Sequence, residues 1–174
     1  AAKAVDLFGC IFGHCTEIVD AAQAYIQADM EGDPTWVCLP HEARPEWWRA
    51  NFPNLRCPVR KLHKALYGHP DAGTYWEHKC DAHVQSVGYV PIGPEWPSCY
   101  YHTKLSLMLA YYIDDFKLLG KKDNITAGWN LLRNGLHIEP ERRVDQNGAV
   151  YLGCRHIVST IKLQSGGQSH DYDV

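Results

Sequence analysis

The sequence predicts an α+β fold in which helices cover one face of an antiparallel sheet, and three observations support this. Short apolar or β-branched segments typical of strands occur at residues 16–19 and 35–39. Two segments with the periodicity of amphipathic helices follow. Between them lies a long apolar run that ends in two aspartates. The order strand, helix, strand-turn-strand, helix, strand is that of a split β-α-β (ferredoxin-like) unit.

The first predicted helix covers residues 72–87. Its apolar side chains recur every three or four positions and are Ala72, Trp76, Cys80, Val84 and Val87. Asp71 is placed to cap the first turn, and Gly88 follows the last turn. The periodicity therefore predicts a buried stripe that contains the Trp76 ring.

The second predicted helix covers residues 124–134. Ile125, Trp129 and Leu132 line one side of it, Asp123 is its expected cap, and Gly135 follows its end. The segment AVYLGCRHIV, residues 149–158, is predicted to return to the sheet as the last strand.

The stretch LSLMLAYYIDDFKLLG, residues 105–120, predicts the central hairpin, with strands at 105–113 and 116–119 and Asp114-Asp115 at the tip. Aspartate is common in turns, which is a purely structural explanation. The favoured two-residue turns, however, carry glycine or asparagine, and neither occurs here. Adjacent carboxylates at the end of an apolar strand also repel each other and lose hydration, so a cation is expected to stabilise them.

Magnesium is the expected cation, because hard oxygen ligands suit Mg²⁺. Two metal ions about 4 Å apart require a further carboxylate. Asp20 is the best candidate, because it ends the first predicted strand, which lies beside the central hairpin in this strand order. We therefore expect Asp20, Asp114 and Asp115 to converge around Mg²⁺ or Mn²⁺.

Composition favours a single domain over residues 1–174, since 174 residues with 45% hydrophobic side chains can bury one sizeable core. The net charge of −3 gives no overall attraction to nucleic acid, so such a partner requires local basic clusters. Seven cysteines without a CxxC pair favour reduced thiols in the cytoplasm or nucleus. No apolar run approaches the ~20 residues of a membrane span, so no membrane partner is expected.

Four motifs follow one another along the chain: DAAQAYIQA (20–28), VRKLHKALYGHPDAGTYW (59–76), YIDD (112–115) and YLGC (151–154). Together they resemble the successive motifs of the reverse transcriptase of copia-type LTR retrotransposons, an RNA-directed DNA polymerase. The resemblance covers about residues 15–158 and implies a polymerase palm. Most of the fingers, and the thumb and RNase H regions, are missing from this chain, so it is not expected to be active alone.

The resemblance also implies roles for individual residues. Asp20, Asp114 and Asp115 would be the catalytic, metal-binding triad of a nucleotidyltransferase, and Ala21 could offer its carbonyl to the second metal. Tyr25 would lie under the sugar of the incoming dNTP and exclude a 2′-hydroxyl. The backbone of Gln23 and Ala24 would lie close to the triphosphate. A core aromatic is the structural alternative for Tyr25.

The implied partners are dNTPs, an RNA/DNA template-primer and the remainder of a Pol polyprotein, within a virus-like particle. A basic cluster could contact template or primer phosphates, although a solvated charged face explains it about as well; its members are Arg56, Arg60, Lys61 and Lys64. One departure concerns the residues after LYG. The family usually has Leu-Lys-Gln there, whereas this chain has His69, Pro70 and Asp71, and the acid would repel phosphate.

Two other classes of protein remain as alternatives. The first is a zinc-binding module built from GCIFGHC (9–15), HKCDAH (78–83) and CRH (154–156), although none of these has the paired spacing of a structural zinc site. The second is a catalytically dead palm retained as a nucleic-acid-binding or structural module. The short chain and Asp71 favour this alternative, and the complete set of three aspartates speaks against it.

Overall fold

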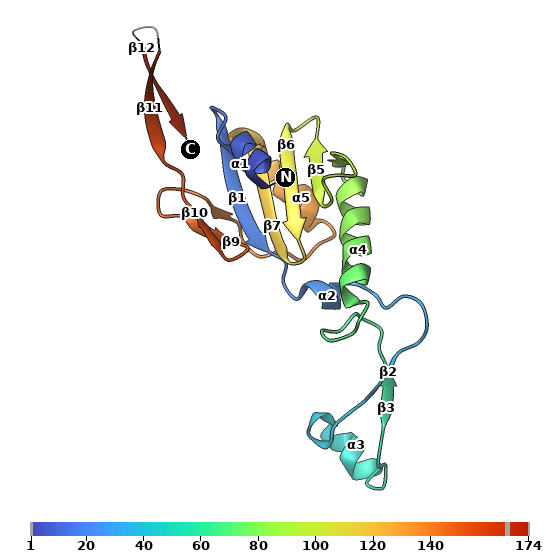
Figure 1. Ribbon diagram of the computed structural model, residues 1–174. Helices are drawn as coiled ribbons and strands as arrows, with labels where there is room; N and C mark the ends of the chain where they lie inside the picture. The colour runs from blue at the N-terminus through green and yellow to red at the C-terminus, as the bar shows by residue number, and fades with distance from the viewer. Residues whose placement is uncertain (1, 166–167, 174) are drawn as a thin grey trace. The chain divides into compact units, whose positions relative to one another are not determined.

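The computed structural model describes residues 2–165 and 168–173 (Figure 1). The chain divides into two compact units. The first consists of Ala1–Ala24 and Glu77–Val174, and the second of Tyr25–Trp76. The first unit has an α+β fold in which helices pack on an antiparallel sheet.

The sheet of the first unit has six strands, and all neighbouring strands are antiparallel. In spatial order they are β4 (Val90–Pro91), β5 (Cys99–His102), β6 (Leu107–Tyr112), β7 (Asp115–Lys121), β1 (His14–Asp20) and β8 (Arg142–Arg143). β7 is central, and its Phe116, Leu118 and Leu119 side chains are fully buried. The strand predicted at residues 16–19 is thus confirmed as part of β1.

Both predicted helices are confirmed, as α4 (Ala72–Ser86) and α5 (Ile125–Arg133). Four residues of the expected stripe are buried, Ala72, Trp76, Cys80 and Val84, and Trp76 is 1% exposed. Val87 lies beyond the end of α4 and is half-buried. The prediction of Asp123 as the cap of α5 is wrong: Asn124 occupies that position, because the chain first makes a 3₁₀ turn, η2 (Lys122–Asn124). None of the helices in the described part of the chain has the length and apolar character needed to cross a membrane.

α4 packs on the sheet through an aromatic group. The Tyr100 hydroxyl donates a hydrogen bond to Asp81 of α4 at 2.6 Å. Tyr100 stacks on Tyr111, and Tyr111 stacks on Phe116, with ring centroids 5.8 and 5.2 Å apart. These rings link α4 to three neighbouring strands, β5, β6 and β7.

α5 lies on the same face of the sheet. A Cβ on Gly128 would meet Leu107 at 2.4 Å and Leu118 at 3.0 Å, so only glycine lets the helix approach this closely. The Nε2 group of His83 on α4 donates to the carbonyl of Leu132 on α5 at 2.9 Å. The two helices are therefore held to each other as well as to the sheet.

The opposite face is covered in part by α1 (Ala2–Gly9), a helix that the sequence did not predict. Val5 packs against Cys99 and Leu119, and the Lys117 ammonium pairs with Asp6 at 2.8 Å. Lys117 and Leu119 alternate with Phe116 and Leu118 along β7, so the two sets face opposite sides. Figure 1 shows α1 in front of the sheet and α5 behind it.

The prediction of one strand over residues 149–158 is wrong. These residues form a hairpin of two short strands, β9 (Ala149–Tyr151) and β10 (Cys154–His156). The chain reverses at Leu152 and Gly153, whose φ angles are 50° and 73°. The strand that pairs with the outer edge of β1 is instead β8. A separate pair, β11 (Thr160–Ser165) and β12 (Gln168–Asp173), follows.

The second unit contains a hairpin and short helices, α2 (Ala24–Gln27), β2 (Trp36–Cys38), η1 (His41–Ala43), α3 (Glu46–Asn51) and β3 (Val59–Lys61). β2 confirms the strand predicted at residues 35–39 and pairs with β3 in antiparallel fashion. On α3, the buried Trp48 ring lies under the guanidinium of Arg60, 4.6 Å from its carbon to the ring centroid.

Candidate active site

Two of the predicted site aspartates face each other across neighbouring strands. Asp20 is the last residue of β1, Asp115 is the first residue of β7, and the register pairs them directly. The N–H of Ala21 donates to the carbonyl of Asp114 at 2.6 Å, which ties the third aspartate to the same edge of the sheet. Side chains on directly opposed antiparallel residues start about 5 Å apart, so Asp20 and Asp115 form one acidic cluster.

The hairpin turn lies one residue earlier than predicted. Tyr112 pairs with Asp115, so the two turn residues are Ile113 and Asp114, and Asp115 already belongs to β7. Ile113 has a φ of 54°, a conformation that strains a β-branched side chain. Such strain persists where the surrounding structure fixes it, and it concentrates at functional sites.

The acidic cluster has excess negative charge. Burial raises the pKa of Asp115 above its ordinary value, and the charges of Asp114 and Asp20 and a hydrogen bond with Asp20 raise it further. The guanidinium of Arg142 has the opposite effect. Arg142 donates to the Asp20 carboxylate at 3.0 Å, so one cation already compensates part of the charge.

Asp115→Asn is expected to stabilise the fold at pH 7.5. The pKa of Asp115 is higher in the folded than in the unfolded chain, so stability falls as pH rises through the interval between the two values. Asparagine removes this effect and one like-charge contact, worth about 0.5 kcal/mol. Urea unfolding should show the gain at pH 7.5 and a smaller one at about pH 3.5, because the raised pKa leaves Asp115 mostly protonated there.

The exposed Asp33→Asn serves as the control and should leave the free energy of unfolding unchanged at both pH values. A loss of stability in Asp115→Asn at pH 7.5 would show that the carboxylate is stabilised in place and is not under electrostatic repulsion.

The acidic cluster has the kind of ligand atoms that bind a divalent cation. Its donors are carboxylate oxygens, and a cation would lower the raised pKa of Asp115. Arg142 would compete for Asp20. Within residues 2–165 and 168–173, no group of three or more His, Cys, Asp or Glu side chains is already arranged as a metal site.

The Cys and His motifs that suggested zinc do not assemble into a site in the described residues. Burial raises the pKa of Cys80 to about 12, which favours the neutral thiol over the thiolate that zinc requires. The His14 ring instead bonds to the carbonyl of Phe8 through Nδ1 at 2.8 Å.

The backbone after Asp20 is fixed by the segment that follows α5. Ala21 makes an antiparallel bridge with Ile138, and the N–H of Ala22 donates to the carbonyl of His137 at 3.0 Å. Gln23 is exposed and has a φ of 52°, whereas Ala24 is fully buried. The predicted nucleotide-contacting residues Ala21, Gln23 and Ala24 thus lie on a firmly held turn.

Tyr25 belongs to the second unit. Its half-buried ring packs against Tyr67 of the LYG motif, with centroids 4.5 Å apart and planes at 41°. The predicted basic residues are also in this unit and are exposed. Arg60 covers Trp48, and Lys64 pairs with Asp29 at 2.5 Å. The charge of Lys64 is therefore already compensated.

Arg56 and Lys61 are exposed, and Lys61 pairs with Trp36 at the end of the β2–β3 hairpin. Asp71, which stands where the family usually has glutamine, is exposed, and its N–H donates to the His69 ring at 3.2 Å. The His69 ring also contacts Thr35 at 3.1 Å. The segment after LYG is thus fixed by its own histidine.

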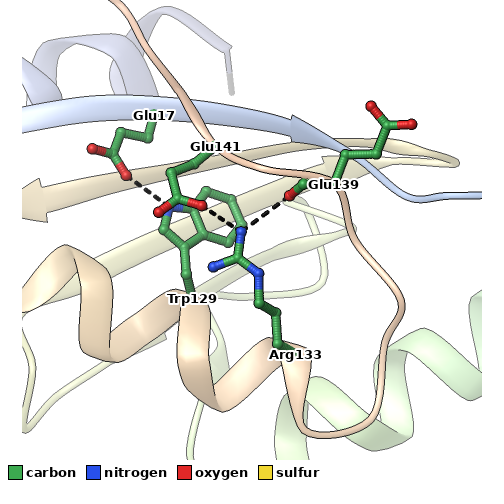
Figure 2. A network of polar contacts seen from close by, with 5 residues as sticks. All are labelled: Glu17, Trp129, Arg133, Glu139 and Glu141. Carbon is green, nitrogen blue, oxygen red and sulfur yellow. Dashed lines mark hydrogen bonds and ion pairs between the residues drawn. The ribbon is translucent and has the colours of Figure 1, made fainter.

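The residues that hold β8 beside β1 were not predicted from the sequence. Glu17 of β1 is 6% exposed and accepts hydrogen bonds from Trp129 at 2.9 Å and from Arg143 at 2.8 Å. Figure 2 shows Glu17 reaching the Trp129 indole, with Arg133 between Glu141 and the Glu139 carbonyl. Arg133 donates to that carbonyl at 3.0 Å and pairs with Glu141.

These contacts hold the segment before β8 against α5 and β8 against β1. The N–H of Glu139 also donates to the carbonyl of Asp20 at 2.9 Å. The run Glu141-Arg142-Arg143 was the available signal, because charges of opposite sign close together in a sequence indicate ion pairs.

No protein-family model and no curated protein matches this chain.

Proposed function

We propose that this chain is the palm region of an RNA-directed DNA polymerase of copia type, which transfers a nucleotide from a dNTP to a primer 3′-hydroxyl. The observation that carries the proposal is the direct pairing of Asp20 with Asp115, with Asp114 in the adjoining turn. Three carboxylates at one edge of a sheet, next to a strained turn, are suited to metal-dependent phosphoryl transfer.

The order of the strands supports a palm. β6, β7, β1 and β8 are neighbours in that order, α4 connects β1 to the β5–β6 hairpin, and α5 connects β7 to β8. This is the arrangement of a split β-α-β unit with both helices on one face. β4 and β5 extend the sheet beyond β6.

In this proposal Asp20, Asp114 and Asp115 hold Mg²⁺ or Mn²⁺. When bound, the metal lowers the pKa of the primer hydroxyl and neutralises charge on the leaving pyrophosphate. The first unit supplies the carboxylates and the fixed turn at Ala21, and the role of Tyr25 beside the sugar rests on the resemblance alone. Arg142 neutralises Asp20 before metal and substrate arrive. No side-chain nucleophile is needed.

Nucleic acid would be held by the exposed cations Arg56, Arg60 and Lys61, whereas Lys64 would first have to leave Asp29. The acidic Asp71 opposes phosphate at the position where the family has glutamine. The remainder of a Pol polyprotein is a further proposed partner.

A catalytically inactive palm is the second candidate, and the Arg142–Asp20 ion pair favours it. A guanidinium fixed on the first aspartate would replace the metal permanently. The two candidates differ in whether a divalent metal can displace Arg142.

Calorimetry with Mn²⁺ or Mg²⁺ is expected to show dissociation constants in the millimolar range, because each ion depends on substrate phosphates for part of its shell. Asp114→Asn should weaken binding, and Asp33→Asn should not change it. Arg142→Gln should strengthen binding by removing the competing cation. Submicromolar affinity, or affinity unaffected by Asp114→Asn, would argue against this site. No binding even in Arg142→Gln would favour the inactive palm.

A further inference from the structure

Two exposed thiols lie next to each other in the second unit. Cys38 ends β2 and Cys57 lies two residues before β3, and their Sγ atoms are 2.9 Å apart. Both cysteines are exposed, and no disulfide joins them. The two sulfur atoms are adjacent, and the solvent reaches both side chains.

The backbone around the pair is held on both sides. Cys38 pairs with Val59 in the β2–β3 register, and the N–H of Leu39 donates to the carbonyl of Pro58 at 3.0 Å. These two contacts bring the strand that ends in Cys38 beside the segment that contains Cys57.

Arg44 lies in the segment between the two cysteines and also holds the backbone near both of them. Its guanidinium donates to the carbonyls of Leu39 at 3.1 Å, Leu55 at 3.1 Å and Arg56 at 3.2 Å. One side chain thus joins the residue after Cys38 to the two residues before Cys57. The alignment of the thiols is therefore built into the fold of this unit.

We propose that Cys38 and Cys57 form a peroxide-sensitive dithiol that closes reversibly to an intramolecular disulfide. A thiolate of one cysteine attacks a peroxide oxygen, which gives a sulfenic acid and, after protonation of the leaving hydroxide, water. The other thiol attacks the sulfenic sulfur, forms the S–S bond and releases a second water. Two thiols are oxidised by two electrons in total, and one hydrogen peroxide is reduced to two waters. A small thiol such as glutathione reverses the reaction by exchange.

Closure has a structural consequence for residues 39–56. This segment carries η1 and α3, and on α3 and just after it Trp47 and Phe52 are 57% and 53% exposed. A disulfide would join the two ends of the segment covalently and reduce its opening. Oxidation should therefore protect the tryptic site at Arg49 within the segment.

The pH dependence follows from the reactive species. The hydrogen bond with Cys57 raises the pKa of Cys38, so Cys38 keeps its proton to higher pH than an isolated thiol. Only the thiolate reacts with peroxide. Closure should be faster at pH 8.5 than at pH 6.5.

The test treats the reduced full chain with one equivalent of hydrogen peroxide, blocks the remaining thiols by alkylation and maps them by mass spectrometry. We expect a linked pair of peptides containing Cys38 and Cys57 that separates on reduction, while the exposed Cys154 stays alkylated. Two outcomes would overturn the proposal. One is alkylation of both Cys38 and Cys57 after the peroxide is consumed, and the other is oxidation that yields only linked dimers.

Arg44→Lys tests whether the three Arg44 hydrogen bonds align the thiols, because lysine keeps the charge but cannot donate to three carbonyls in one plane. Closure should slow about tenfold, as expected when two reacting groups lose their mutual orientation. In Cys57→Ser, Cys38 should form a sulfenic acid that dimedone traps, and no disulfide. An unchanged rate of disulfide formation in Arg44→Lys would contradict the role of Arg44 in aligning the thiols. A disulfide between Cys38 and another cysteine in Cys57→Ser would contradict the pairing of Cys38 with Cys57.

Discussion

Trp129→Ala is expected to lower the free energy of unfolding by about 3–5 kcal/mol, the usual loss when a buried tryptophan leaves a cavity. Trp129 is fully buried between α5 and the sheet. The substitution also removes the indole N–H that donates to Glu17 at 2.9 Å. Domains of this size are stable by about 5–15 kcal/mol, so the loss takes a large share of the total. Urea unfolding followed by circular dichroism measures it.

Two variants separate the cavity from the hydrogen bond. Trp129→Phe keeps most of the volume but leaves one oxygen of the buried Glu17 without its donor, which should cost about 1–3 kcal/mol. Trp47→Ala removes a ring that is 57% exposed and should change stability by about 0.5 kcal/mol or less. Equal effects of Trp129→Ala and Trp47→Ala would show that α5 does not pack on the sheet as described.

Tyr25→Ala is expected to raise the use of ribonucleotides relative to deoxyribonucleotides by about a hundredfold, since excluding one hydroxyl is worth a few kcal/mol. The measurement uses a chimera in which this chain replaces the matching region of an active reverse transcriptase. The readout is the ratio of kcat/KM values for a dNTP and its rNTP in primer extension.

Asp115→Asn in the same chimera should abolish incorporation of both nucleotides, because it removes a proposed metal ligand. Asp33→Asn should change neither activity nor selectivity. If Tyr25→Ala lowers dNTP and rNTP use by the same factor, the ring serves only to pack against Tyr67, and its proposed role in excluding the 2′-hydroxyl is wrong.

The helices and the central hairpin could be predicted because their patterns are local. The stripe of α4 repeats over four turns, and the apolar run of β6 ends at polar residues. The pairing of Asp20 with Asp115 followed from the order of the elements, because a split β-α-β unit places the first strand beside the hairpin. Topology thus brought together residues 95 positions apart.

The errors have physical causes that a local pattern does not reveal. The reversal at Leu152 depends on a positive φ that leucine rarely adopts, so the segment resembled a continuous strand. β8 consists of two arginines without strand propensity, and it is fixed by Glu17 and Asp20, which lie more than 120 positions earlier. Ile113 replaces the expected aspartate in the turn for the same reason, since pairing across the sheet sets the register.

The central claim is that Asp20, Asp114 and Asp115 together bind a divalent metal. Titration of the isotope-labelled chain with Mn²⁺ and dTTP, followed by NMR, tests it directly, because Mn²⁺ broadens the signals of nearby amides. The account predicts that the amides of Asp20, Ala21, Asp114 and Asp115 broaden first, and that Asp115→Asn removes the effect. Broadening that begins elsewhere, or that persists unchanged in Asp115→Asn, would contradict it.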